Sequence, residues 1–180
     1  MIEGYFDGAA EPNPGAGAAG AYIEQDGQIL WQTSCYIGNN ITNNVAEYRA
    51  LIMLLEAAQR LNIKSMIIYG DSQLVINQMN FVYNINKPEL KVLAQAAFGL
   101  LKGINVTFMW IKRENNKRAD ELSREALNNK HGTGCLYCKN LCFDNGNAYC
   151  KIFSIQIIAL SGVACIANSC KQYEDKVDEQ

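Results

Sequence analysis

The sequence predicts an α/β domain whose mixed five-stranded sheet carries helices on both faces, followed by a small Cys-rich appendage. Three strand-like segments open the chain, and helix-like and strand-like segments then alternate. Six of the seven cysteines lie between Cys135 and Cys170, while Cys35 stands alone before them. We therefore expect one folded domain over residues 1–128, a polar linker over 129–134 and a Cys-rich extension over 135–180.

The start of the domain has the pattern of three antiparallel strands. Met1–Asp7 alternates with the period of two that is typical of a half-buried strand. Gly8–Gly15 contains two prolines and small residues, which predicts a loop. Ala16–Gln25 and Gln28–Ile37 follow as strands, joined by Asp26-Gly27, a dipeptide typical of two-residue hairpins.

Helices alternate with strands in the rest of the domain. Val45–Leu61 has helical spacing, with Asn44 as the expected N-cap and Glu47 as its capping-box partner. The further elements that we expect are a strand over Ser65–Tyr69, a short helix after Asp71, a helix from Pro88 to Leu101, a strand over Asn105–Ile111 and a helix from near Asn116 to Asn128.

Charge and hydropathy argue against a polycationic surface and against a membrane span. Residues 1–128 carry 11 Lys and Arg against 13 Asp and Glu, and residues 129–180 carry five of each, so broad positive charge cannot dominate nucleic-acid binding. The apolar run 152–167 contains Gln156, Ser161 and Gly162 and is shorter than the ~20 residues of a membrane helix. The chain starts without the features of a signal peptide. We expect a cytoplasmic monomer without a membrane anchor.

Four acidic residues stand at the ends of predicted elements: Asp7, Glu47, Asp71 and Asp120. Carboxylates that meet at one edge of a sheet raise one another's pKa unless a cation compensates them. Hard oxygen ligands favour Mg²⁺ or Mn²⁺, and two such ions about 3.5–4 Å apart suit displacement at a phosphodiester. Each acid alone also has an ordinary interpretation, as a capping, turn or helix-start residue.

Four segments, in this order, resemble the four motifs of type 1 ribonuclease H: Tyr5-Phe6-Asp7-Gly8, Thr42-Asn43-Asn44-Val45-Ala46-Glu47, Gly70-Asp71-Ser72-Gln73 and Asn116-Lys117-Arg118-Ala119-Asp120-Glu121-Leu122. The resemblance covers residues 1–128. It implies a ribonuclease H-like fold and hydrolysis of the RNA strand of RNA–DNA hybrids, which leaves 5′-phosphate and 3′-hydroxyl ends. It also implies two Mg²⁺ or Mn²⁺ ions, held by the catalytic quartet Asp7, Glu47, Asp71 and Asp120.

The same resemblance gives expected roles to residues that would bind the substrate. Gly8 would let the minor groove, with its 2′-hydroxyls, approach the backbone. Thr42 would hold a phosphate. Amide groups able to bind sugars and base edges are Asn13, Asn43, Asn44 and Gln73. Each of these residues has an alternative role in a turn or a cap.

The sequence departs from the family pattern at two places. Many members carry a basic, Trp-containing protrusion, but here Asn80–Tyr83 leads almost directly to Pro88, as in the compact subgroup that lacks it. Many members also carry a His in the loop before the last Asp. The loop 111–116 has none, so we expect Arg113 or Glu114 to replace it. The remaining basic cluster is Lys112, Arg113, Lys117, Arg118 and Arg124, of which Arg124 is expected to lie on a solvated helix face.

The Cys-rich extension contains Cys135, Cys138, Cys142, Cys150, Cys165 and Cys170. The spacing of the first two is typical of a zinc or iron–sulfur site, and free thiols or disulfides are the alternatives. For the whole chain we hypothesise a ribonuclease H. Two alternatives are a non-catalytic module that binds nucleic acid or protein, and a ribonuclease H domain coupled by its extension to another nuclease or replication system.

Overall fold

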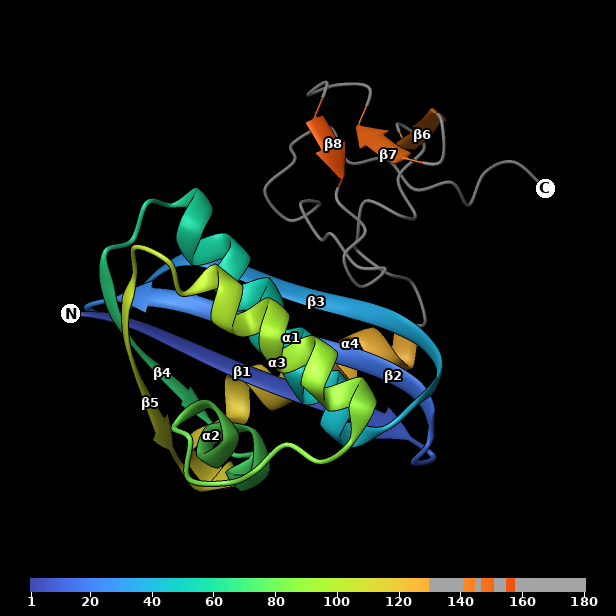
Figure 1. Ribbon diagram of the computed structural model, residues 1–180, viewed down its shortest axis with the longest axis horizontal. Helices are drawn as coiled ribbons and strands as arrows, with labels where there is room; N and C mark the ends of the chain where they lie inside the picture. The colour runs from blue at the N-terminus through green and yellow to red at the C-terminus, as the bar shows by residue number, and fades with distance from the viewer. Residues whose placement is uncertain (130–140, 145–146, 151–154, 158–180) are drawn as a thin grey trace.

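A computed structural model gives the structure of the chain and describes residues 1–129, 141–144, 147–150 and 155–157. Residues 1–129 form one sheet and its helices (Figure 1). Their elements in chain order are β1 (Ile2–Glu11), β2 (Gly15–Gln25), β3 (Gln28–Ile41), α1 (Asn43–Arg60), β4 (Ser65–Gly70), α2 (Gln73–Met79), α3 (Pro88–Leu100), β5 (Asn105–Trp110), the 3₁₀ turn η1 (Arg113–Asn115) and α4 (Lys117–Asn129).

The sheet has the strand order β3-β2-β1-β4-β5, with β1 at its centre. β1 is antiparallel to β2, and β2 to β3, whereas β1, β4 and β5 run parallel to one another. Helices α1 and α3 cover one face, and α4 lies across the other (Figure 1). The predicted five-stranded mixed sheet with helices on both faces is confirmed.

Helix α1 supplies much of the core because it packs between the sheet and α3. Leu51, Leu54 and Leu55 are fully buried, together with Phe6 of β1 and Ile68 of β4. Burial of one such side chain contributes roughly 1.5–3 kcal/mol. This packing holds α1 against β1 and β4, the strands next to Asp7 and Asp71.

The Asp26-Gly27 hairpin forms as the dipeptide predicts. Gln25 of β2 pairs with Gln28 of β3, which leaves two residues in the turn. Both have positive φ, 52° for Asp26 and 82° for Gly27. Such values are those of the turn that matches the twist of the flanking strands.

The predicted loop over 8–15 is wrong for its first half. β1 continues to Glu11, and Gly8–Glu11 pairs with Ala16–Ala19 of β2. Small residues have weak strand propensity, but here pairing with a neighbouring strand overrides it. Only the segment around Pro12 and Pro14 turns.

The predicted N-cap of the first helix is also wrong. Helix α1 begins at Asn43, and its N-cap is Thr42, whose Oγ1 accepts a hydrogen bond from the backbone N–H of Val45 at 3.4 Å. Asn44 therefore lies inside the helix. Glu47 is buried in the second turn and is not a capping partner.

The described part of the Cys-rich extension is a three-stranded antiparallel sheet of β6 (Leu141–Asp144), β7 (Asn147–Cys150) and β8 (Ile155–Ile157). Of the six predicted cysteine ligands, Cys142 lies in β6 and Cys150 in β7. The other four cysteines, residues 130–134 of the linker and most of the apolar run lie outside the described residues, and Asn129 belongs to α4. In the described part of the chain, no helix has the length and apolar character to cross a membrane.

Candidate active site

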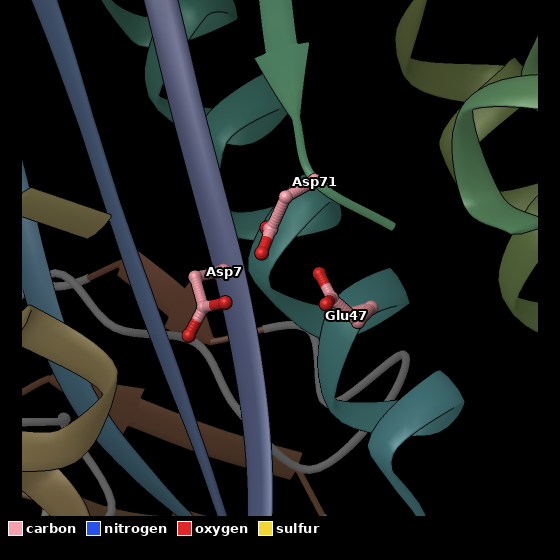
Figure 2. A group of neighbouring side chains, drawn as sticks. All are labelled: Asp7, Glu47 and Asp71. Carbon is pink, nitrogen blue, oxygen red and sulfur yellow. The ribbon is translucent and has the colours of Figure 1, made fainter. Parts of the chain in front are cut away.

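Three of the four predicted acids meet at one place. One carboxylate oxygen from each of Asp7, Glu47 and Asp71 lies within 4.8 Å of those from the other two (Figure 2). Phe6 of β1 pairs with Gly70 of β4 in parallel register, so the residues that follow them in the chain, Asp7 and Asp71, reach the same level. The shared register therefore explains how two acids far apart in sequence become neighbours.

Glu47 joins them because β1 is longer than β4. β4 ends at Gly70, while β1 continues to Glu11, so this edge of β1 is open beyond Gly70. Asp7 bonds Ser123 of α4, on one face of the sheet, while Glu47 comes from α1 on the other. The open edge lets the two carboxylates approach each other.

Gly8 is required for this approach. A Cβ atom on Gly8 would lie 2.0 Å from the backbone nitrogen of Glu47 and 2.1 Å from the carbonyl carbon of Ala46. Interaction with the backbone N–H of Gly8 also opposes the rise in the pKa of Glu47. The structure thus gives Gly8 a packing role toward α1, and the expected contact with a minor groove stays a prediction.

Burial and mutual repulsion make the cluster electrostatically unfavourable by itself. Asp7 is 3% exposed, and burial raises its pKa from 3.8 to about 6. The charges of Asp71 and Asp120 add to this rise, whereas the hydrogen bond from Ser123 opposes it. Burial, followed by the charges of Asp7 and Asp71, also raises the pKa of Glu47 well above its usual value. A cation would offset these costs.

The three side chains fit a divalent metal ion. All their ligand atoms are hard carboxylate oxygens, the type that Mg²⁺ and Mn²⁺ prefer. Glu47 Oε2 is buried and has no hydrogen-bond partner among the described residues. An unsatisfied buried oxygen beside two other carboxylates has the chemistry of a metal ligand.

Asp120 lies beside this group rather than within it. Its Oδ1 accepts a hydrogen bond from Arg113 Nη2, and its Oδ2 accepts one from Arg124 Nε at 2.7 Å. The structure therefore shows the fourth predicted acid held by two guanidinium groups. Arg124, which we predicted to lie on a solvated helix face, is one of these two partners of Asp120.

A cavity of about 380 Å³ opens over the acids. Its lining includes the acids Asp7, Glu47 and Asp71 together with the basic residues Arg113 and Arg124. Negative and positive groups that line one cavity suit a metal ion together with a phosphate.

The predicted substrate-binding residues fall into two groups. Asn13 and Asn43 border the acidic cavity, but their side chains also tie backbone segments together. Asn13 Oδ1 accepts from Asn43 N at 3.1 Å, and Asn43 Oδ1 accepts from Ala10 N at 2.8 Å. Thr42 caps α1. Their alternative structural roles are confirmed, while their contacts with substrate stay predictions.

Asn44 and Gln73 lie elsewhere. Asn44 lines a second cavity of about 210 Å³, whose lining includes Asn86 and Lys87 and none of the four acids. Gln73 is exposed at the first residue of α2. Among the described residues, no hydrogen bond joins either side chain to the acidic cluster.

Two buried residues of the site were missed by the sequence reasoning. Asn116 Nδ2 donates to the backbone oxygen of Phe6 at 2.8 Å and to Asp71 Oδ1 at 2.9 Å. Ser123 Oγ donates to Asp7 Oδ2. Asn116 begins a segment that resembles a family motif, and Ser123 stands three residues after Asp120 on the same helix face. The motif position of Asn116 and the helix-face position of Ser123 are the sequence features that could have identified these two residues.

The sheet order, the helices on its two faces and the acids at the open edge of its central strand define a ribonuclease H-like domain. The chain belongs to the ribonuclease H-like family described as "Reverse transcriptase-like", whose model matches residues 5–126. This match covers the whole described domain except its first and last few residues.

Individual relatives agree with the family. Ribonuclease HI of Halobacterium salinarum is 40% identical over 128 residues, which are 70% of this chain and 64% of that protein. The bifunctional protein Rv2228c of Mycobacterium tuberculosis is 35% identical over 126 residues and is matched over 34% of its length. The chain therefore matches less than two thirds of the length of these relatives.

Solved structures show the same fold. The crystal structure of RNase H1 from Halobacterium salinarum superposes with a TM-score of 0.68 at 39% identity, and the match covers 71% of this chain and 98% of that one. LC11-RNase H1, whose structure is a complex with an RNA/DNA hybrid, also gives a TM-score of 0.68, at 38% identity over 72% of this chain and 99% of that one.

Proposed function

We propose that this chain is an endoribonuclease that hydrolyses the RNA strand of RNA–DNA hybrids with the help of two Mg²⁺ or Mn²⁺ ions. The observation that carries the proposal is the convergence of Asp7, Glu47 and Asp71 in the lining of an open cavity. The relatives named ribonuclease H, and the RNA/DNA hybrid bound to LC11-RNase H1, support the choice of substrate.

The residues of the site have separable tasks. Asp7, Glu47 and Asp71 would hold the ions, with Asp120 as the fourth acid once its arginine partners release it. Bound ions would supply an activated water and stabilisation of the leaving oxygen. Arg113 stands on the cavity wall, where its guanidinium would bind a substrate phosphate by charge-assisted hydrogen bonds.

The same burial argues against a module that only binds. Asp7 and Glu47 are 3% and 9% exposed, and each is held near other acids. Such a cluster weakens the metal-free fold and repels nucleic acid, so it gives no benefit to a protein that merely binds a hybrid. A divalent ion gives it a use.

A cleavage assay tests the proposal. The full-length chain, with Mg²⁺, should cut the RNA strand of an end-labelled hybrid and leave duplex DNA of the same sequence intact, with 5′-phosphate on the new ends. Asp71→Asn should lower the rate by a factor of about 10³ or more, because a metal ligand is lost. Asp26→Asn, which changes an exposed acid of the β2–β3 turn that pairs with the N-terminus and does not line the cavity, is the matched control and should cleave as the wild type does.

Two results would contradict the proposal. Wild-type protein that binds the hybrid but leaves it intact with both Mg²⁺ and Mn²⁺ would favour the non-catalytic module. Cleavage that survives Asp71→Asn would place the chemistry at another site or in a contaminant.

A further inference from the structure

Helix α4 presents one hydroxyl group to the acidic cluster. Ser123 is fully buried, and its Oγ donates a hydrogen bond to Asp7 Oδ2. The same Oγ lies 2.9 Å from the backbone oxygen of Asp120, one turn earlier in the helix. A serine hydroxyl has one proton, so these two acceptors compete for it.

The carboxylate is the stronger of the two acceptors. A serine inside a helix usually bonds the carbonyl three or four residues earlier, which leaves its hydroxyl without a tertiary role. Hydrogen bonds to an ionised acceptor are roughly twice as strong as those to a neutral one. The proton of Ser123 is therefore directed to Asp7 when that carboxylate is charged, as it is when it binds a metal ion.

The position of this hydroxyl is set by close packing of backbones. Asp7 of β1 pairs with Gly20 of β2, and a Cβ atom on Gly20 would lie 2.4 Å from both the backbone nitrogen of Ser123 and the backbone oxygen of Ala119. Ser34 Oγ also donates to the backbone oxygen of Leu122 at 2.7 Å. Helix α4 is thus held directly beside Asp7, without an intervening side chain at Gly20.

We propose that Ser123 is a positioning residue of the metal site, whose hydroxyl fixes the plane of the Asp7 carboxylate. Figure 2 shows one oxygen of Asp7 turned toward Glu47 and the other turned away from it. A bond from Ser123 to one oxygen stops the carboxylate from rotating, so the other oxygen keeps its direction toward Glu47 and Asp71. The inference rests on the proposed function only in requiring that the cluster binds a divalent ion.

The expected effect is on metal affinity. Loss of an outer partner that orients a metal ligand typically weakens binding by a factor of about 10–100. Ser123→Ala should weaken Mn²⁺ binding by about tenfold, while the maximal rate at saturating metal stays within about threefold of the wild type. The KM for the hybrid should stay unchanged, because Ser123 is buried and does not line the cavity.

Direct titration of Mn²⁺ into the full-length protein, followed by the electron paramagnetic resonance signal of the free ion, tests this. Asp71→Asn defines the binding that is not due to the cluster. Ser123→Thr keeps the hydroxyl and should restore affinity. Ser34→Ala removes another buried hydroxyl at the sheet–α4 contact, one that donates to the backbone oxygen of Leu122, and should bind as the wild type does. Alanine favours helix, so Ser123→Ala is expected to fold, which circular dichroism checks.

The outcomes separate this inference from the proposed function. Wild-type protein that binds no more Mn²⁺ than Asp71→Asn would end both. Wild-type affinity in Ser123→Ala would end only the role of Ser123. Equal losses in Ser123→Ala and Ser34→Ala would show that helix docking matters and not the hydroxyl. A folded Ser123→Thr that fails to recover affinity would also refute the inference.

Discussion

Replacing Asp7 by Asn should change how the stability of the metal-free protein depends on pH. Burial raises the pKa of Asp7 from 3.8 to about 6, so the folded protein keeps a proton on this group at pH values where the unfolded chain has lost it. The contribution of Asp7 to the free energy of unfolding is therefore most favourable below pH 3.8. It falls as the pH rises toward 6 and stays low above that value.

The magnitude follows from the pKa of Asp7. The difference between 3.8 and about 6, at 1.36 kcal/mol per unit of pKa, corresponds to a loss of at most about 3 kcal/mol at pH 7. Asn is neutral at all pH values and keeps an oxygen that can accept the bond from Ser123. We expect Asp7→Asn to be more stable than the wild type by about 1–3 kcal/mol at pH 7, with no such gain at pH 4.

Urea denaturation followed by circular dichroism, with a chelator and a thiol reductant, measures this difference at both pH values. Asp26→Asn is the matched control. The hydrogen bond from the N-terminus lowers the pKa of Asp26, so the shift is opposite in sign to that of Asp7. Asp26→Asn should therefore gain no stability at pH 7. If Asp7→Asn is no more stable than the wild type at pH 7, Asp7 is not an unfavourable buried charge and the reasoning fails.

Three further substitutions test the packing and the polar contacts of the site. Gly8→Ala should lower the free energy of unfolding by about 1–3 kcal/mol and abolish cleavage, because the added Cβ would collide with the backbone of Glu47. Gly99→Ala is the control: open space surrounds Gly99, so this variant should keep wild-type stability and cleavage. Asn116→Ala should lower the free energy of unfolding by about 2–4 kcal/mol in urea denaturation, because it leaves a buried carbonyl and a carboxylate without their donor; an unchanged midpoint would count against this role. Arg113→Ala should raise the KM for the hybrid by about tenfold with little change in the unfolding midpoint, and an unchanged KM would show that Arg113 does not contact substrate.

The fold could be predicted from local signals because this chain's strongest signals agree with its topology. Asp26-Gly27 joins its two strands in the predicted turn, and Pro88 occupies the first turn of its helix. The register of β1 with β4 then brings Asp7 and Asp71 to the same level, although only Asp71 follows the carboxyl end of its strand and Asp7 lies within the longer β1. The hydrophobic period of a strand or helix and the residue types of a turn are properties of short segments, so they can be identified directly in the sequence.

The parts that could not be predicted depend on contacts between distant segments. The sequence around Gly8 predicts a loop, but Gly8 pairs with Ala19 of β2 and so belongs to a strand, and α1 packs against it. Glu47 has the spacing of a capping residue, yet Thr42 caps the helix instead. Asn116 and Ser123 act on acids 45 and 116 residues away. A local sequence pattern cannot indicate contacts between residues so far apart in the chain.

The carboxylates of the cluster should not contribute independently to stability. The charge of Asp7 is one cause of the raised pKa of Glu47, so Asp7→Asn should lower that pKa and reduce the repulsion that Glu47→Gln would otherwise relieve. At pH 7 without metal, the stability gained by the double variant should therefore be smaller than the two single gains together. Urea denaturation of the four proteins gives the coupling energy, and gains that add to within about 0.5 kcal/mol would mean that the two groups do not interact. Such a coupling would mean that a divalent ion bound to the cluster would stabilise it as one unit, since the ion would reduce the repulsion among all three acids at once.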